Sequence, residues 1–195
     1  INAALRRQLQ QQAALQRSIA GMVRIAEKRA EAEQRRENAR KHHGNNGGGN
    51  TGGGGGGNGS MIWPVSGQVS QEFGCTGFVW EPPYGSCAHF HQGIDIVAPY
   101  GTPVRASGDG TVVYIGWNYA DGADPAWIVI VAHSDSLQTW YAHLQARYPG
   151  GIHTGSTVKQ GQIIGYEGNT GHSTGAHLHW AVMFHGDFVN PRLFL

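Results

Sequence analysis

Two histidines near the end of the chain have the spacing of metal ligands or of paired catalytic groups. His177 and His179 stand two residues apart in the run His-Leu-His-Trp-Ala-Val-Met-Phe. This run is typical of a β-strand, in which side chains at i and i+2 point to the same face. The two imidazoles therefore converge on one point, which suits a metal ion or a metal ion and its bound water. Two exposed histidines on one strand are common, so the pair needs support from elsewhere in the chain.

A histidine and a carboxylate four residues apart supply that support. His91-Gln92-Gly93-Ile94-Asp95 precedes a short apolar run at 96–98, so we expect Asp95 at the mouth of a strand. Gly93 allows the backbone to bend so that His91 and Asp95 reach one ion. With His179 they form a set of two nitrogens and one oxygen, which suits zinc with a fourth position open to water. An open position of this kind is typical of a catalytic zinc site rather than a structural one.

A further histidine, His143, lies in Trp140-Tyr141-Ala142-His143-Leu144, which we expect to be another strand with the imidazole turned inward. The three motifs, in this order, resemble those of the lysostaphin-type zinc metalloendopeptidases. The resemblance covers about residues 61–195. It extends to matching segments at 98–106, 108–113 and 168–171.

The resemblance implies both the roles of these residues and an activity. It implies that His91, Asp95 and His179 bind zinc and that His143 and His177 are the catalytic histidines. Members of the family cleave peptide bonds in bacterial cell-wall peptidoglycan, by attack of a metal-activated water. The chain has no His-Glu-x-x-His helix, so the base of many zinc proteases is absent and the histidine pair must replace it. Which of the two histidines acts as the base stays open.

Beyond residue 60 the sequence has the pattern of a β protein. Runs rich in β-branched and aromatic residues cover 111–117, 127–132 and 138–144, and Asp135-Ser136 marks a hairpin turn between the last two. No segment there has a helical period. We therefore expect a mainly antiparallel sheet folded into a compact barrel or sandwich with one open groove, as the family resemblance also implies.

Residues 1–43 have a different composition, rich in Ala, Gln, Arg and Glu and without proline, which predicts a long helix. A four-three spacing marks a coiled-coil seam along it. The seam positions are Leu5, Leu9, Gln12, Gln16, Ile19, Val23, Ala26 and Ala30. A lone helix of this kind is marginal in water, so we expect it to pair with itself, with an upstream helix or with a partner helix.

Residues 44–60 contain eleven glycines in seventeen positions, which predicts a flexible tether between the helix and a catalytic domain at 61–195.

Charge is unevenly divided along the chain: residues 1–43 carry ten Lys/Arg and four Asp/Glu, and the remaining residues carry four Lys/Arg and nine Asp/Glu. The basic arm favours an anionic neighbour such as a membrane surface, a wall polymer or an acidic partner, although a solvated Arg-rich helix explains it equally well. We expect no nucleic-acid partner, because no aromatics interleave with the basic run. The sequence has no apolar run long enough for a transmembrane span.

Two cysteines, Cys75 and Cys87, lie in the Gly/Pro-rich loop before His91 and match no zinc motif. In an oxidising compartment they would form a disulfide; two buried free thiols are the alternative. A disulfide and a cell-wall substrate together predict that the protein is extracellular, in the cell envelope or periplasm, or part of a phage virion. All six tryptophans lie beyond residue 60, and some are candidates for lining a substrate groove.

Two other functions compete with an active endopeptidase. One is a non-catalytic coiled-coil relative that binds and activates a cell-wall amidase, which the long helix favours and the intact ligand set disfavours. The other is a lytic component tethered to a phage tail, which is compatible with an active enzyme. The sequence does not show whether the scissile bond lies in a glycine bridge or in a direct cross-link. It also does not distinguish a bacterial origin from a phage origin.

Overall fold

The computed structural model describes residues 61–119 and 124–195. The predicted helix over 1–43 and the tether over 44–60 lie outside the described residues. Twelve strands and one short 3-10 helix make up the described part. In chain order they are β1 (Gln68–Gln71), β2 (Gly74–Cys75), β3 (Phe90–His91), β4 (Ile94–Val97), β5 (Pro103–Arg105), β6 (Gly110–Asn118), β7 (Ala126–Ser134), β8 (Leu137–Ala142), β9 (Thr157–Val158), β10 (Ile163–Tyr166), β11 (Leu178–Phe184), β12 (Asp187–Val189) and η1 (Pro191–Phe194).

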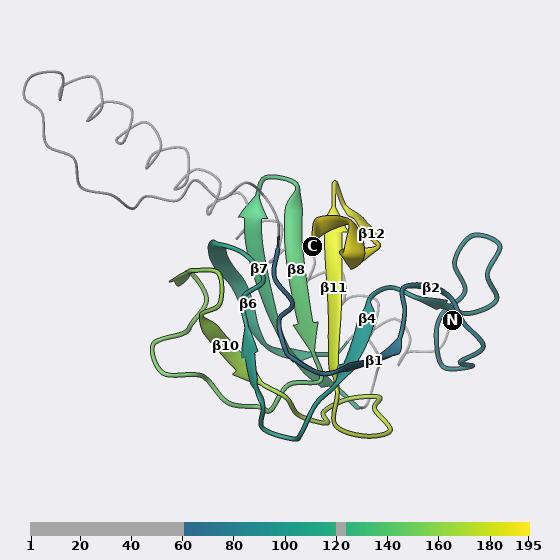
Figure 1. Ribbon diagram of the computed structural model, residues 1–195, viewed down its shortest axis with the longest axis horizontal. Helices are drawn as coiled ribbons and strands as arrows, with labels where there is room; N and C mark the ends of the chain where they lie inside the picture. Colours follow the sequence, from purple (N-terminus) through teal and green to yellow (C-terminus); the bar gives the residue numbers. More distant parts are fainter. Residues whose placement is uncertain (1–60, 120–123) are drawn as a thin grey trace, which may run out of the picture.

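One antiparallel sheet dominates the fold. Its strand order is β1-β4-β11-β8-β7-β6-β9, with β12 paired to β11 (Figure 1). A two-stranded sheet of β5 and β10 contributes Val104 and Ile164 to the main core, so it packs on one face of the large sheet. The prediction of a mainly antiparallel β domain is confirmed, and the arrangement is that of two unequal layers around one core.

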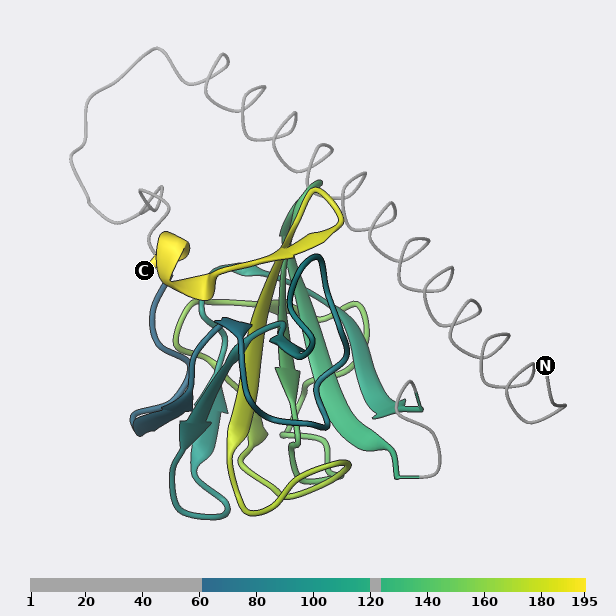
Figure 2. The ribbon, with the colours of Figure 1, turned by 90° about the vertical axis from the view of Figure 1, so that its right-hand side faces the viewer.

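The long strands follow their side-chain alternation. Trp180, Tyr141 and Val129 are cross-strand neighbours on β11, β8 and β7, and all three are fully buried in the main core. The hairpin between β7 and β8 turns at Asp135-Ser136, as the sequence predicts. Strand β11 runs from the loop at 167–177 at one end of the sheet to the β12 hairpin and η1 at the other end (Figures 1 and 2).

One buried carboxylate ties the two layers together. Glu167 has no exposed surface, and its Oε1 accepts a hydrogen bond of 2.7 Å from the backbone N–H of Ala98, just after β4. Its Oε2 has no hydrogen-bond partner. Burial raises the pKa of Glu167 to about 7, against the lowering effect of the Ala98 bond.

The backbone N–H of Met61, the first residue of the described part, donates to the carbonyl of Phe194, the next-to-last residue, so the two ends of the described fold are joined. The next residue continues the attachment, because the N–H of Ile62 donates to the carbonyl of Ser107. Within the described residues no helix has the length and apolarity needed to cross a membrane.

Candidate metal centre

Pairing between β4 and β11 creates the candidate metal centre. Asp95 and His179 are 84 residues apart in sequence and directly opposite each other in the antiparallel ladder. His91 lies on β3, just before β4. The three side chains each offer one ligand atom, and these atoms lie within 4.8 Å of one another. The predicted ligand trio is therefore brought together by one strand pair and one short connection.

The three donor atoms form a nearly equilateral triangle. His91 Nε2 lies 3.1 Å from Asp95 Oδ1 and 3.0 Å from His179 Nδ1, and His179 Nδ1 lies 3.0 Å from Asp95 Oδ1. Ligands on one tetrahedral ion at zinc distances would be roughly 3.3 Å apart. The triangle thus has nearly the size that one such ion requires. His91 is fully buried, whereas the side chains of Asp95 and His179 keep 14% and 22% of their surface, so the site opens to solvent on one side.

Neighbouring groups fix the orientation of two of the ligands. His91 Nδ1 lies 3.0 Å from the carbonyl oxygen of Glu72, so the ring N–H donates there and Nε2 is free to bind a metal. Gly93 has a different role from the predicted backbone bend, because its φ is not positive. A Cβ at this position would lie 2.7 Å from His179 Nε2 and from the Trp180 carbonyl oxygen. Glycine is required here because β11 passes too close for any side chain.

The charges within the trio favour an ionised carboxylate. Burial by itself would raise the pKa of Asp95, but hydrogen bonds from His179 and His91 outweigh burial and hold this pKa well below its usual range. Burial likewise would lower the pKa of His91, and the adjacent Asp95 raises it overall. A metal ion bound by these three atoms would replace any protons on them, because metal ligands must be deprotonated.

Two more histidines stand beside the trio. The ring centroids of His143 and His177 are 4.6 Å apart, and His177 Nε2 lies 3.8 Å from Asp95 Oδ2. The ring of His143 is 6.0 Å from that of His179. All five residues singled out in the sequence therefore meet at one end of the sheet.

His143 is held in an unusual backbone conformation. The sequence predicted that it lies on a strand, and this is wrong: β8 ends at Ala142, and His143 has a φ of 62°, in the left-handed region that non-glycine residues seldom adopt. Its Nδ1 lies 2.7 Å from the carbonyl oxygen of Thr170. Burial, with smaller effects from His179 and His177, lowers the pKa of His143 to about 4. The left-handed turn aims a neutral imidazole, with Nδ1–H held by Thr170, at the site.

His177 is oriented by the loop that precedes β11. It forms an isolated bridge with Gly168, one residue before the strand begins. Its Nδ1 lies 2.8 Å from the Gly175 carbonyl oxygen and 3.1 Å from Ser173 Oγ. Ser173 Oγ in turn lies 2.6 Å from Asn169 Oδ1, to which its hydroxyl donates. Ser173 is not among the site residues predicted from the sequence, although it stands in the same short run as the two histidines.

The loop before His91 is closed by a disulfide and carries two exposed aromatic rings. A disulfide joins Cys75 and Cys87, which confirms the oxidised form of the cysteine pair. Between them Phe78 and Trp80 remain 42% and 61% exposed and stack edge to face at 5.2 Å. Trp80 also lies 6.1 Å from His172, in the glycine-rich loop before β11. Two loops that carry or flank site residues thus meet through exposed aromatic rings.

Two other histidines of the described residues make contacts away from the trio. His89 Nδ1 lies 2.9 Å from the carbonyl oxygen of Glu81, within its own loop. His133 lies near the end of β7 and bonds Thr139 Oγ1 at 2.7 Å and the Asp109 carbonyl oxygen at 2.8 Å, as expected for a structural strand-end residue.

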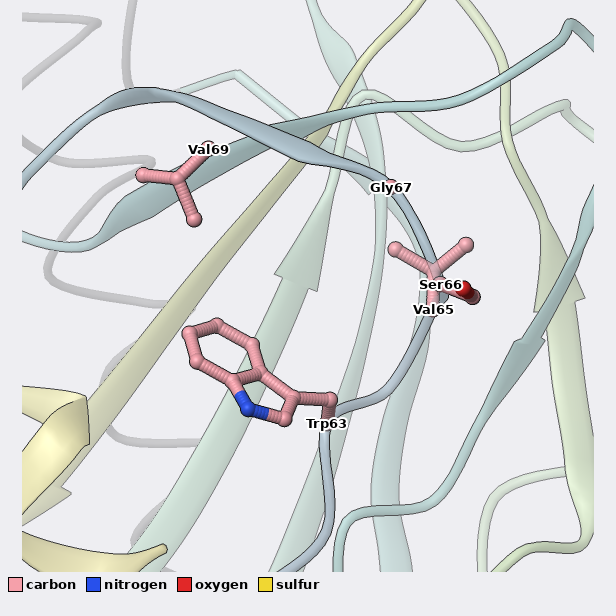
Figure 3. A pocket seen from close by; sticks show the side chains of 5 residues that line it. All are labelled: Trp63, Val65, Ser66, Gly67 and Val69. Atoms are coloured by element: carbon pink, nitrogen blue, oxygen red, sulfur yellow. The ribbon is translucent and has the colours of Figure 1, made fainter.

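A separate hollow of about 270 Å³ lies elsewhere on the domain, lined by Trp63, Val65, Ser66, Gly67 and Val69 (Figure 3). The ring of Trp63 packs 5.7 Å from that of Trp180, whose side chain points away from the face that carries His179. The hollow contains none of the five site residues, so it is not the catalytic groove.

Comparison with known proteins identifies a family and several relatives. A profile of peptidase family M23 matches residues 89–191. The peptidoglycan DD-endopeptidase ShyC of Vibrio cholerae is 45% identical over 102 residues, which cover 52% of this chain and 22% of that protein. The glycyl-glycine endopeptidase ALE-1 of Staphylococcus capitis is 40% identical over 109 residues, covering 55% of this chain and 28% of that protein. The chain therefore spans less than a third of the length of these relatives.

Solved structures agree with the fold. The catalytic domain of lysostaphin from Staphylococcus simulans matches with a TM-score of 0.54 and 31% identity, over 69% of this chain and 96% of that one. A zinc-containing peptidase from Vibrio cholerae matches with a TM-score of 0.55 and 28% identity, over 67% of this chain and 39% of that one.

Proposed function

The chain belongs to peptidase family M23, and on that basis we propose that it is a zinc-dependent endopeptidase that cleaves peptide cross-links of bacterial peptidoglycan. The observation that carries the proposal is the triangle of His91, Asp95 and His179 donor atoms, with His143 and His177 beside it. Relatives named as a DD-endopeptidase and as a glycyl-glycine endopeptidase support a peptide bond in the wall as the substrate.

We assign zinc binding to His91 Nε2, Asp95 Oδ1 and His179 Nδ1. Two nitrogens and one carboxylate oxygen, with one side open to solvent, fit the donor set of a catalytic zinc site. Bound there, zinc would polarise a peptide carbonyl and lower the pKa of a water molecule. The hydrogen bond from His91 Nδ1–H to Glu72 fixes the tautomer that this assignment needs.

We assign proton handling to His143 and His177. Each has Nδ1 engaged with a backbone carbonyl, that of Thr170 or of Gly175, so each turns Nε2 toward the site. Such an Nε2 can accept the proton of an attacking water and later return it to the leaving amine. The exposed rings of Phe78 and Trp80 offer an apolar wall for the peptide on the disulfide-closed side.

We propose the domain organisation expected from the sequence: a helical coiled-coil arm at 1–43, a glycine-rich tether at 44–60 and the peptidase domain at 61–195. The bond between Met61 and Phe194 supports a domain boundary at residue 61. The Cys75–Cys87 disulfide supports work in an oxidising compartment, outside the cytoplasm. A non-catalytic amidase activator is disfavoured, because such a protein has no use for a complete ligand triangle flanked by two oriented histidines.

The test is digestion of purified walls of two kinds, cross-linked directly or through glycine bridges. We expect new amino groups without new reducing sugar ends, loss of release on chelation and recovery with added zinc. His179→Ala should be inactive, and His153→Ala, a change at an exposed histidine outside the site, should be fully active. Release of sugar ends, or full activity of the metal-free protein, would refute the proposal.

A further inference from the structure

The metal ligand His91 takes its orientation from a carbonyl group that lies just outside the main sheet. His91 Nδ1–H donates to the backbone oxygen of Glu72 at 3.0 Å. Strand β1 ends at Gln71, whose partner in the ladder is Asp95, and Glu72 is the next residue. The ladder of β1 and β4 thus stops one residue short of Glu72, so other contacts must fix the direction of this carbonyl.

The peptide group that carries this oxygen joins Glu72 to Phe73, and the side chains on both sides of it are anchored. Phe73 packs against the main core and meets Phe90, the neighbour of His91, edge to face with ring centroids 5.0 Å apart. Glu72 is anchored to the other end of the domain. Its Oε1 accepts from Arg192 Nη2 at 2.6 Å and its Oε2 accepts from Arg192 Nε at 3.0 Å. A bidentate pair of this kind fixes direction as well as distance.

Arg192 is itself held by the segment around it. It lies in η1, where its N–H donates to Oδ1 of the cap residue Asn190 at 3.0 Å. Its guanidinium carbon lies 5.2 Å from the centroid of the Trp63 ring. Helix η1 follows β12, and β12 and β4 pair with β11 on the same side (Figure 1). This placement brings Arg192 to Glu72, 120 residues away in sequence.

We infer that Arg192 is a positioning residue for the metal centre, an inference that rests on the proposed function. By holding the side chain of Glu72, Arg192 restricts rotation of the peptide whose oxygen binds His91 Nδ1–H. His91 Nε2 then stays directed at Asp95 and His179, the other two proposed ligands. Glu72 and Arg192 both lie outside residues 89–191, so the family match assigns no role to either of them.

The surface position of the pair limits the size of the effect. The side chains of Arg192 and Glu72 keep 45% and 54% of their surface exposed, and an exposed ion pair changes an equilibrium constant by at most about fivefold. Arg192→Ala should therefore weaken zinc binding by about three- to fivefold. Glu72→Ala should have the same effect, because it removes the same pair from the other end. The double variant should lose no more than either single variant, since the pair is already broken.

The two single variants also separate positioning from a simple effect of charge. Arg192→Ala removes a positive charge and Glu72→Ala removes a negative one, so their fields would change the affinity for a cation in opposite directions. A loss of affinity in both variants identifies positioning. Arg192→Lys keeps the charge without the planar fork and should recover only part of the loss.

The test is a zinc titration of the full chain in competition with a chromophoric chelator, beside urea unfolding of the metal-free proteins to show that each variant is folded. Lys159→Ala is the matched control. It removes another exposed ion pair, with Asp109 at 2.9 Å, at the β6–β9 edge of the sheet, opposite the β1 edge. Lys159→Ala should leave the zinc affinity unchanged.

Several results would overturn the inference. Unchanged zinc affinity in a folded Arg192→Ala chain would refute it, and so would shifts of opposite sign in the two single variants. Additive losses in the double variant would show that Glu72 and Arg192 act separately, and an equal loss in Lys159→Ala would show that the effect is not specific to this pair. A wild-type chain that binds no zinc would refute the proposed function as well, whereas the other results refute this inference alone.

Discussion

The buried carboxyl of Glu167 makes the stability of the domain depend on pH, and substitution of this one residue separates its contribution from those of other groups. Its pKa is raised from an ordinary value of 4.5 to about 7 because the side chain is buried. A raised pKa means that the folded state holds the proton more tightly than the unfolded chain does. The contribution of Glu167 to stability is therefore complete below pH 4.5 and is lost as pH rises through 7.

The size of this loss follows from the two pKa values. A difference of 4.5 to about 7 corresponds to about 3 kcal/mol at 1.36 kcal/mol per pKa unit. Glu167→Gln keeps the shape and an oxygen that can accept from Ala98 N–H, and it stays neutral at every pH. The buried amide N–H groups add a cost that does not change with pH. The free energy of unfolding of Glu167→Gln, minus that of the wild type, should therefore rise by about 3 kcal/mol from pH 4 to pH 8.5.

The assay is urea unfolding of both proteins at a series of pH values, because subtraction at each pH removes the contributions of all other titrating groups. Glu72→Gln is the control of opposite sign. Glu72 is exposed, and its hydrogen bonds with Arg192 lower its pKa, so its contribution is present above pH 4.5 and lost as pH falls. Its loss should cost no more than about 1 kcal/mol at neutral pH. A Glu167→Gln difference that stays constant with pH would refute the reasoning.

Three further predictions concern the metal centre. His179→Ala should lose both metal and activity, whereas His177→Ala should keep about one zinc per chain and lose roughly 10²- to 10⁴-fold in rate, measured by elemental analysis beside turnover. Ser173→Ala should keep zinc and KM but lower kcat by about tenfold, because His177 loses one of the groups that orient it, and Ser173→Thr should restore much of the loss. Gly93→Ala should weaken zinc binding by about tenfold or more in a competition titration, because the added methyl group would displace His179.

Each of these predictions has a result that contradicts it. A metal-free His177→Ala beside a zinc-loaded His179→Ala would invert the two roles. A Ser173→Ala enzyme with an unchanged kcat would show that the backbone carbonyl of Gly175 orients His177 without help. Unchanged zinc affinity in Gly93→Ala would show that β11 can move away from this position.

The sequence alone was sufficient wherever the evidence is local or periodic. Alternation along a strand places His177 and His179 on one side, and the β-rich runs and the turn at Asp135-Ser136 predict the hairpin of β7 and β8. The short loop around Cys75 and Cys87 allowed a disulfide, which the structure contains. These inferences need only the two-residue repeat of a strand and the short reach of a loop, which are properties of neighbouring residues.

Tertiary structure decided what depends on residues far apart in the chain. The register that sets Asp95 opposite His179 joins strands 84 residues apart, and no local pattern determines it. Residue types do not predict the left-handed turn at His143, and they do not predict that the backbone carbonyl of Glu72 orients His91. The sequence suggested that Gly93 allows a backbone bend, whereas in the structure glycine is needed because β11 passes close to this position. Burial of Glu167 likewise results from packing between two layers. Such features arise only when distant segments meet, because the free energy of each contact depends on which partner the fold brings to it.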